Sequence, residues 1–238
     1  MQLIEKILEG MGLSADHFKK DSIVILGSCR LEGLIDESYI HEIHHTHNTK
    51  EAIQYLEYIT GKIDIPSELH PYVFRSCFLD KNKCIDRDIL LEELESADLV
   101  CIEICSRKKY IKNGFYIHHL SADKGDSPEN VFVEEKKTND EFILELQGRD
   151  EIEEDILFLL DLLQDKKVLF VTHIDSGISK RKALIDDVVA ICRRHGIPCA
   201  NPSDIYGALK NEMIDANHFT KKGQKMLARF IRKKMASF

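Results

Sequence analysis

Short apolar runs alternate with amphipathic stretches along most of the chain. A continuous apolar run predicts a strand buried on both faces, whereas apolar residues at intervals of three and four predict a helix that packs on one side. The expected strands lie at 22–27, 39–45, 98–105, 167–174 and 197–202. The expected helices lie at 3–12, 48–61, 87–97, 151–164 and 180–196, with a last helix that carries Met226, Leu227, Phe230 and Ile231 on one face.

This alternation of strands and helices predicts an α/β fold. We expect a three-layer α/β/α arrangement around a mainly parallel five-stranded sheet, with right-handed crossovers of the SGNH or flavodoxin type. Asn113-Gly114 stands between two apolar-aromatic runs and predicts a β-hairpin turn. The chain is therefore interpreted as one domain over 1–238 with a hairpin insertion at about 106–137.

Composition narrows the class of protein. The 238 residues include 43% hydrophobic ones, enough for a sizeable core, and a net charge of -8 argues against a nucleic-acid partner. No apolar run is long enough for a bilayer and the N-terminus lacks a signal-peptide pattern, so we expect a cytoplasmic protein without a membrane partner. Seven cysteines without a C-x-x-C pair predict reduced thiols rather than a disulfide framework.

Candidate site residues follow from the fold class. In a parallel sheet, ligands bind at the carboxyl ends of the strands, so the polar residues just after each predicted strand are the candidates. They are Ser28, Cys29 and Arg30; His45, His47 and Asn48; Glu103 and Ser106; His173 and Asp175; and, before the last helix, Asp215 and His218.

Two short motifs carry a family resemblance. "ILGSC" ends the first strand, and Asp215-x-x-His218 precedes the last helix. With this order of elements the chain resembles the SGNH/GDSL superfamily of esterases and acyltransferases. The cysteine in the nucleophile position resembles SGNH-like proteins of capsular and surface polysaccharide biosynthesis and sugar acetyltransferases of large DNA viruses. The family's Gly-x-Asn-Asp block has no counterpart in "EICSRKK".

The resemblance implies that Cys29 is the nucleophile, with Ser28 as second choice, that His218 is the base and that Asp215 orients it. A thiol at the start of a helix beside Arg30 and an imidazole is expected to have a lowered pKa. Backbone amides near Cys29, with Asn48 or Ser106, are expected to hold the oxyanion. His47, Arg30, Glu103 and His173 are expected to line the substrate cleft.

Acyl transfer is the preferred reaction, because an acyl-CoA and an acyl-cysteine are both thioesters. The expected donor is acetyl-CoA, whose phosphates the basic run Lys180, Arg181 and Lys182, or alternatively Arg107, Lys108 or Lys109, could hold. The resemblance implies a sugar acceptor, preferably an amino or nucleotide sugar of surface-glycan synthesis. A carbohydrate or lipid esterase and a non-catalytic flavodoxin-like binding module are the alternatives, and a homodimer is left open.

Structural interpretations stand beside these functional ones. Gly-Ser-Cys could be only a tight turn, Asp215 to His218 only a helix entry, the basic run only a solvated helix start, and His173 a satisfied core histidine. Glu103 lies within an apolar strand and requires a partner such as Arg30 or a substrate amine. The histidines His41, His44, His45 and His47 lack the spacing of a known metal motif, and a strand would point alternate ones to opposite faces, so no metal is expected.

Overall fold

The computed structural model describes residues 22–35, 40–80, 82–122, 137–138, 142–175, 177, 179–215 and 218–237. The helix expected over 3–12 lies outside these residues. Among the described helices, none has the combination of length and apolar character that a membrane span needs.

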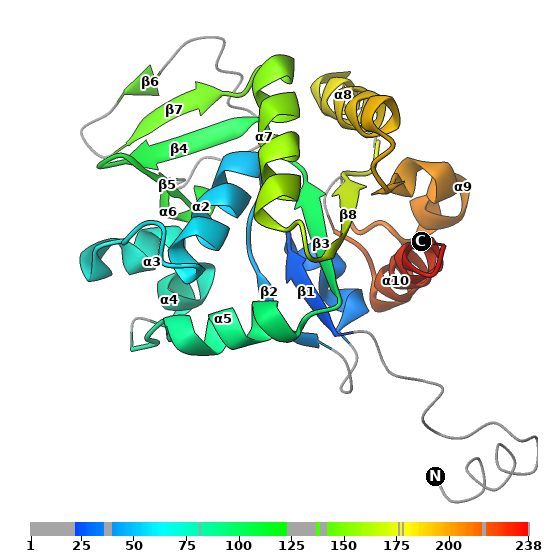
Figure 1. Cartoon of the computed structure of the whole chain (residues 1–238). Coiled ribbons are helices and arrows are strands. Elements are labelled where there is room, and N and C mark those ends of the chain that lie inside the picture. The colour runs from blue at the N-terminus through cyan, green and yellow to red at the C-terminus, as the bar shows by residue number, and fades with distance from the viewer. Residues whose placement is uncertain are drawn as a thin grey trace, which may run out of the picture.

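A five-stranded parallel sheet forms the centre of the molecule (Figure 1). Its order is β2-β1-β3-β8-β9, and each neighbouring pair runs parallel. The strands are β1 (Ile23–Leu26), β2 (Ile40–His44), β3 (Leu99–Ile104), β8 (Lys167–Thr172) and β9 (Cys199–Ala200). The expected fold class is therefore confirmed, and all five apolar runs form strands.

Helices cover both faces of this sheet because successive strand residues point to opposite sides. Val24 and Leu26 pack on one side, where the cover consists of α2 (Thr49–Ile59), α5 (Arg87–Ser96), α7 (Arg149–Leu162) and α8 (Ser179–His195). Ile25 packs on the other side, where the cover consists of the 3-10 helix η2 (Cys29–Leu34), the 3-10 helix η4 (Pro202–Ile205), α9 (Tyr206–Leu209) and α10 (Lys221–Met235). These two apolar clusters are the inner surfaces of a three-layer fold.

The start of α2 shows how the sequence sets an element boundary. Asn48 has extended backbone angles, and its side chain accepts a hydrogen bond from Glu51 N–H at 3.0 Å. Gly61, just after the helix, has a φ of +74°, a conformation that suits glycine. Both ends of this helix are as the sequence predicts.

A second, antiparallel sheet lies beside the first, in the order β5-β4-β7-β6. Its strands are β4 (Lys108–Lys112), β5 (Phe115–Ile117), β6 (Lys137–Thr138) and β7 (Ile143–Leu146). Asn113 and Gly114 have φ values of +51° and +85° in the turn between β4 and β5, so the predicted hairpin is confirmed. The sheet continues past 137 into β7, which extends the excursion beyond its expected limit.

Short helices fill the remaining connections. They are η3 (Ser67–Leu69), α3 (His70–Val73), α4 (Arg75–Leu79), α6 (His119–Ala122) and η5 (Lys210–Glu212). None of them is long enough to give a periodic apolar pattern, so the sequence does not predict them.

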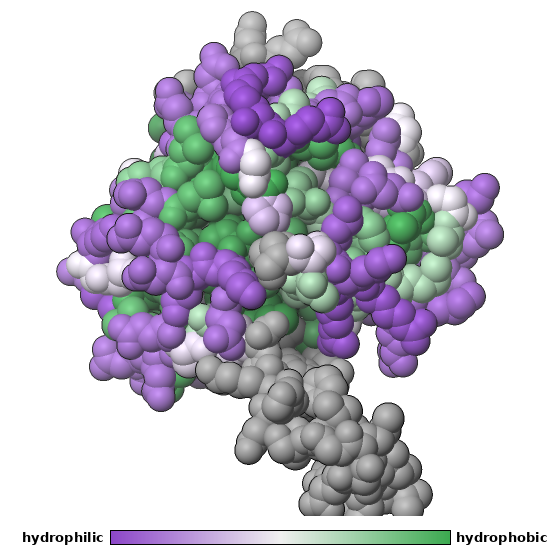
Figure 2. Space-filling view, turned by 45° about the vertical axis from the view of Figure 1, so that its right-hand side comes forward, coloured by the Kyte–Doolittle hydropathy of each residue, from purple (hydrophilic) through white to green (hydrophobic). Residues whose placement is uncertain are grey.

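Space filling shows one face of the molecule where apolar side chains gather in the middle and hydrophilic ones surround them (Figure 2).

Candidate active site

The turn after β1 holds Cys29 at the carboxyl end of the sheet. Gly27 permits this turn, because a Cβ there would lie 2.8 Å from Leu31 Cδ1 and 2.9 Å from Glu103 Cβ. Ser28 is buried, and its Oγ accepts a hydrogen bond from Arg30 N–H at 3.4 Å. Cys29 is half-buried as the first residue of η2. Of the two candidate nucleophiles, only Cys29 retains an accessible side chain.

Behind this turn, Arg30, Glu103 and His173 form a buried polar network. Arg30 Nε and Nη2 donate to Glu103 Oε1 at 3.0 and 2.7 Å, and Ser28 N–H donates to Glu103 Oε2 at 2.8 Å. Arg30 Nη1 lies 2.5 Å from His173 Nε2, and His173 Nδ1 lies 2.8 Å from the Ile174 carbonyl oxygen. The expectation that Glu103 pairs with Arg30 is confirmed. The network holds the turn in place, and it uses the Ser28 amide that was an expected oxyanion donor.

The charge of Arg30 is stable in this network. Burial alone would lower the pKa of its guanidinium, but the Glu103 carboxylate and the neighbouring Cys105 together more than offset burial and raise it. Because His173 accepts from Arg30 and donates to a backbone carbonyl, it is a satisfied core histidine rather than a residue of the cleft.

The environment of Cys29 differs from the expected one. Burial raises the pKa of its thiol, the carboxylates of Glu32 and Glu103 add to the rise, and the charges of Arg30 and Arg75 only partly oppose it. The helix that follows is a 3-10 helix of six residues, so its dipole is short. The expectation of a lowered thiol pKa is therefore wrong. Cys29 is a thiol at neutral pH, and it needs a base to become a nucleophile.

A preformed carboxylate–imidazole pair precedes α10. His218 Nδ1 lies 2.7 Å from Asp215 Oδ2, and His218 N–H donates to Asp215 Oδ1 at 2.8 Å. A bridge between Met213 and Phe219 closes this segment. The predicted contact between Asp215 and His218 is confirmed. It places the imidazole proton on Nδ1 and leaves the Nε2 lone pair to act as a base.

The segments that carry Cys29 and His218 belong to the same layer. A Cβ at Gly33 in η2 would lie 2.5 Å from the Gln224 carbonyl oxygen in α10, so these two helices pack without space between them. Phe219 and Leu31, each adjacent to the site on its own segment, share one apolar cluster. No hydrogen bond or ion pair joins Cys29 to His218 in the part of the chain that the structure describes.

Asn48 and Ser106 were the expected side-chain donors for an oxyanion, and they differ in whether a side-chain hydrogen is still available to donate. Both amide hydrogens of Asn48 are used, since Nδ2 donates to Glu51 Oε1 at 2.7 Å and to the Lys108 carbonyl oxygen at 2.8 Å. Asn48 is 1% exposed and therefore joins α2 to β4 rather than facing a substrate. Ser106 Oγ accepts from Lys108 N–H at 3.0 Å and keeps its own proton as a donor.

The basic residues proposed for CoA phosphates mostly have carboxylate partners. Lys182 lies 2.5 Å from Asp186 on the exposed face of α8, Lys109 lies 2.8 Å from Glu151, and Arg107 pairs with Asp187. Arg181 is half-buried in the first turn of α8, and the side chain of Lys180 lies outside the described residues. For Lys182, the ordinary interpretation as a solvated helix start agrees with this geometry.

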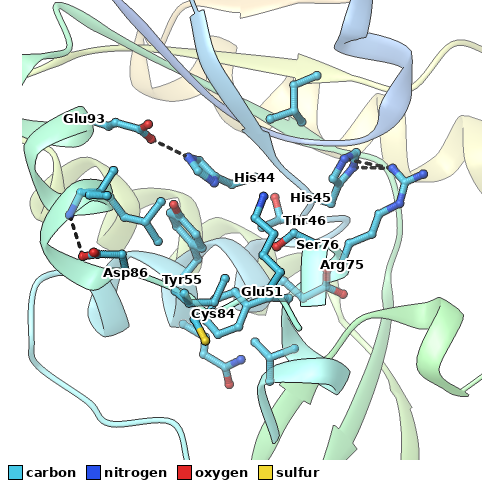
Figure 3. A pocket seen from close by; sticks show the side chains of 18 of the residues that line it. His44, His45, Thr46, Glu51, Tyr55, Arg75, Ser76, Cys84, Asp86 and Glu93 are labelled. Atoms are coloured by element: carbon cyan, nitrogen blue, oxygen red, sulfur yellow. Dashed lines mark hydrogen bonds and ion pairs between the residues drawn. The ribbon is translucent and has the colours of Figure 1, made fainter. Parts of the chain in front are cut away.

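A cavity of about 190 Å³ lies beside β2 and was not predicted (Figure 3). Arg75 contributes to its lining and lies 2.9 Å from His45 Nδ1. His44 stacks on Tyr55 at 4.6 Å and lies 3.5 Å from the Glu93 carboxylate. The charge of Arg75 is also one of those that lower the pKa of the Cys29 thiol. The sequence gives no signal for Arg75, Tyr55 or Glu93, because none of them follows a strand.

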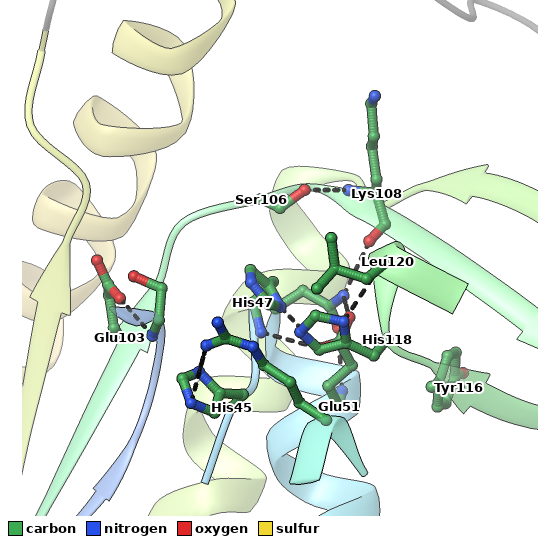
Figure 4. A network of polar contacts seen from close by, with 12 residues as sticks. His45, His47, Glu51, Glu103, Ser106, Lys108, Tyr116, His118 and Leu120 are labelled. Carbon is green, nitrogen blue, oxygen red and sulfur yellow. Dashed lines mark hydrogen bonds and ion pairs between the residues drawn. The ribbon is translucent and has the colours of Figure 1, made fainter. Parts of the chain in front are cut away.

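His47, the remaining predicted cleft residue, lies in a group of histidines that joins the loop after β2 to the residues after β5 (Figure 4). Its partners are His118 and His119, which follow β5 and open α6. One side-chain nitrogen from each of the three lies within 4.8 Å of the others. His44 and His45 point elsewhere, and the side chain of His41 lies outside the described residues.

Comparison with known proteins places the chain in a family. The family model for the TviD N-terminal domain matches residues 22–123 and 119–234. The chain belongs to this family. Among curated proteins, it is similar to "Vi polysaccharide biosynthesis protein TviD" of Salmonella typhi, with 26% identity over 220 aligned residues. The match covers 74% of this chain and 26% of that relative, so the chain spans about a quarter of the relative's length.

A solved structure to which the chain is similar has 12% identity and a TM-score of 0.35, over 59% of this chain and 65% of the solved chain. A likeness at this level supports no argument about the fold. The family match supports the expected relation to polysaccharide-biosynthesis proteins and does not extend it to the SGNH/GDSL superfamily, which stays a prediction.

Proposed function

We propose that this chain is an acyltransferase of polysaccharide biosynthesis that moves a small acyl group from an acyl-CoA, preferably acetyl-CoA, to a sugar. The observation that carries the proposal is the preformed Asp215–His218 pair on the segment leading into α10, the helix that packs on the one beginning with Cys29. The relation to a Vi polysaccharide biosynthesis protein supports the sugar acceptor. A reaction that uses acyl-CoA also favours the cytoplasm as its location.

The first half-reaction loads the enzyme. His218 Nε2 takes the proton from the Cys29 thiol, and the thiolate sulfur attacks the carbonyl carbon of the thioester. The bond between that carbon and the CoA sulfur breaks, and the CoA thiolate leaves with the proton from His218. Because the pKa of Cys29 is raised, this base is needed at neutral pH. One thioester replaces another, so little free energy is lost.

The second half-reaction transfers the acyl group. His218 Nε2 takes a proton from the hydroxyl or amine of the sugar, whose oxygen or nitrogen attacks the acyl carbon on Cys29. The carbon–sulfur bond breaks, and Cys29 regains its proton from His218. Asp215 stabilises the imidazolium in both halves. Ser106 is the proposed side-chain donor to the oxyanion, because both amide hydrogens of Asn48 are used in other hydrogen bonds.

The cavity beside β2 suits the sugar better than the phosphates of CoA. Its lining mixes the carboxylates of Glu51, Asp86 and Glu93 with the cations of Arg75 and Lys83, so it is not the uniformly basic site that the phosphates of CoA would need. Tyr55 in the same lining offers an aromatic surface that matches the apolar face of a sugar ring, while the Gln54 amide is already bonded to the Tyr116 backbone. An amino sugar would place its cationic nitrogen near Glu93.

A two-substrate assay tests the proposal. Release of free thiol from acetyl-CoA is measured with and without amino-sugar acceptors, and hydrolysis of a nitrophenyl ester is measured in parallel. We expect Cys29→Ala to reduce acceptor-dependent thiol release by about 10³-fold or more, and His218→Gln by about 10²–10⁴-fold. Ser28→Ala is the matched control and should retain activity, because its hydroxyl is buried.

Three outcomes would contradict the proposal. Full activity in Cys29→Ala would exclude the thiol as nucleophile. Ester hydrolysis without any acceptor-dependent transfer would favour an esterase. Unchanged behaviour of both Cys29→Ala and His218→Ala, with no activity in any assay, would favour a binding module.

A further inference from the structure

His47 comes from one segment and the consecutive residues His118 and His119 from another, and the three rings contact one another. Their ring centroids lie 4.7 Å apart for His47 and His118, 4.3 Å for His47 and His119, and 4.4 Å for His118 and His119. His47 ends the loop after β2, whereas the other two follow β5, more than sixty residues later. Cys105 and Ser106 N–H both donate to the His47 carbonyl oxygen at 2.9 Å, which ties this loop to the one after β3.

Two ring nitrogens in this group lack a hydrogen-bond partner within the described chain. They are His118 Nε2 and His119 Nδ1, and both are shielded from solvent. The side chain of His118 is only 2% exposed. Buried polar atoms are normally paired, so two exceptions on neighbouring rings indicate a ligand that the rings could share.

His47 has the orientation of a metal-binding imidazole. Its Nδ1 lies 3.3 Å from Glu51 Oε2, the carboxylate that also accepts from His47 N–H at 2.9 Å. With the ring proton directed at this carboxylate, Nε2 presents its lone pair. A carboxylate behind a metal-ligating histidine is the arrangement that orients such ligands in many metalloproteins.

We propose that His47, His118 and His119 form a binding site for one divalent transition-metal ion of the zinc class, with its fourth coordination position open. One nitrogen from each ring lies within 4.8 Å of the other two, close enough for ring rotations to bring all three to Zn–N bonds of about 2.0–2.1 Å. His47 is 15% exposed, which leaves a path from solvent. The open position would accept water or an oxygen of a bound molecule.

The donor set favours a cation as the occupant. Three converging imidazole rings are nitrogen ligands of the kind that bind a transition-metal ion. The Glu51 carboxylate, 3.3 Å from His47 Nδ1, favours a cation, whereas Arg75 and Lys108 act on His119 and oppose one. An anion would be held mainly by these two basic side chains.

Metal binding requires one change at His118. Its Nδ1 accepts from Leu120 N–H at 3.2 Å, so the neutral ring carries its proton on Nε2. Ligation through Nε2 moves this proton to Nδ1 and gives up the long bond to Leu120. The loss of one long hydrogen bond is small beside the formation of a metal–nitrogen bond.

The test is a metal titration of the purified full chain after removal of metals with EDTA. We expect one Zn²⁺ per chain by elemental analysis after gel filtration, and a thermal midpoint that rises with Zn²⁺. Co²⁺ in place of Zn²⁺ should give the visible bands of a tetrahedral site without the thiolate-to-Co²⁺ absorption that cysteine ligands would add. Inorganic phosphate serves as the probe for an anion.

Matched variants separate this site from other histidines. His47→Gln and His119→Gln should each abolish stoichiometric binding while keeping the metal-free thermal midpoint, and His195→Gln, an exposed histidine paired with Glu153, should bind as the wild type does. Glu51→Gln should bind about 10–100-fold more weakly.

Stoichiometric Zn²⁺ retained in both ligand variants would overturn the proposal, as would stabilisation by phosphate and not by Zn²⁺. A chain that binds no Zn²⁺ although its thermal midpoint shows that it is folded would overturn it as well. These readouts are independent of acyl transfer, so the metal site and the proposed function can fail separately.

Discussion

Two groups of polar residues differ in how far their hydrogen bonds are satisfied: one lies after β1, β3 and β8 of the parallel sheet, and the other joins the loop after β2 to the residues after β5. In the Arg30–Glu103–His173 network, every guanidinium nitrogen, carboxylate oxygen and ring nitrogen has a partner. In the His47–His118–His119 group, two ring nitrogens have none within the described residues. Arg30, Glu103 and His173 are all buried, whereas in the histidine group only His118 is buried and His47 and His119 are half-buried. What distinguishes a structural group from a binding group is whether the shielded polar atoms are satisfied, because an unpaired buried atom costs free energy that a ligand can recover.

The largest effect is expected from a variant that breaks the Arg30–Glu103–His173 network. Glu103→Ala leaves the Arg30 charge buried without its carboxylate, and we expect a loss of about 3–5 kcal/mol in the free energy of unfolding, measured by urea denaturation. His119→Gln in EDTA should change stability by less than about 1 kcal/mol, because its Nδ1 has no bond to lose. Equal losses in the free energy of unfolding in Glu103→Ala and His119→Gln would contradict the distinction between the two groups.

A smaller effect is expected at another satisfied position, Thr49. Its hydroxyl donates to Asp155 Oδ2 at 2.5 Å and accepts from Gln147 Nε2 at 2.8 Å. Thr49→Val keeps the shape of the side chain and removes both bonds, so we expect a loss of about 1–3 kcal/mol by urea denaturation. An unchanged free energy of unfolding in Thr49→Val would mean that the hydrogen bonds of a buried polar atom do not predict its contribution to stability.

The pH dependence of stability tests a buried histidine beside a cation. Burial, and next the charge of Arg75, lower the pKa of His45 to about 3, whereas an unfolded histidine titrates at about 6.5. Below pH 6.5 the unfolded chain takes up the proton and the folded chain does not, so stability is complete above that pH and falls as the pH decreases towards 3. At pH 5 we expect His45 to account for about 1–2 kcal/mol of the loss relative to pH 7. His45→Gln should remove that part, and an unchanged pH profile would contradict this.

The smallest effect is expected at Thr46, the unsatisfied counterpart of Thr49. Its Oγ1 is buried and has no hydrogen-bond partner among the described residues. Thr46→Val replaces this hydroxyl with a methyl group, so the free energy of unfolding should stay within about 0.5 kcal/mol or rise. A loss as large as that of Thr49→Val would show that Thr46 has a partner that the structure does not reveal.

Much of the fold could be predicted because local patterns decide it. The apolar runs form the five strands, Asn48 caps α2, and Asn113-Gly114 forms the hairpin turn. The contact between Asp215 and His218 is likewise local, since the two residues are three positions apart. The helices α3 and α4 were missed because five or fewer residues give no periodicity.

The site was predicted only in part because position after a strand says nothing about partners. Arg30 and Asn48 lie where a ligand site is expected, yet Glu103, Glu51 and the Lys108 carbonyl occupy their hydrogens. The raised thiol pKa depends on burial, which the sequence does not fix. His118 and His119 follow β5 and meet His47, which lies far from them in the sequence, so their contact is a long-range relation without a local signal.

The most direct measurement of the central claim is the mass of the protein after incubation with acetyl-CoA in the absence of an acceptor. Peptide mapping by mass spectrometry should show one acetyl group on Cys29, its loss on addition of the sugar acceptor, and no adduct in Cys29→Ala. An acetyl group on another residue, or transfer to the sugar that proceeds unchanged in Cys29→Ala, would contradict the account.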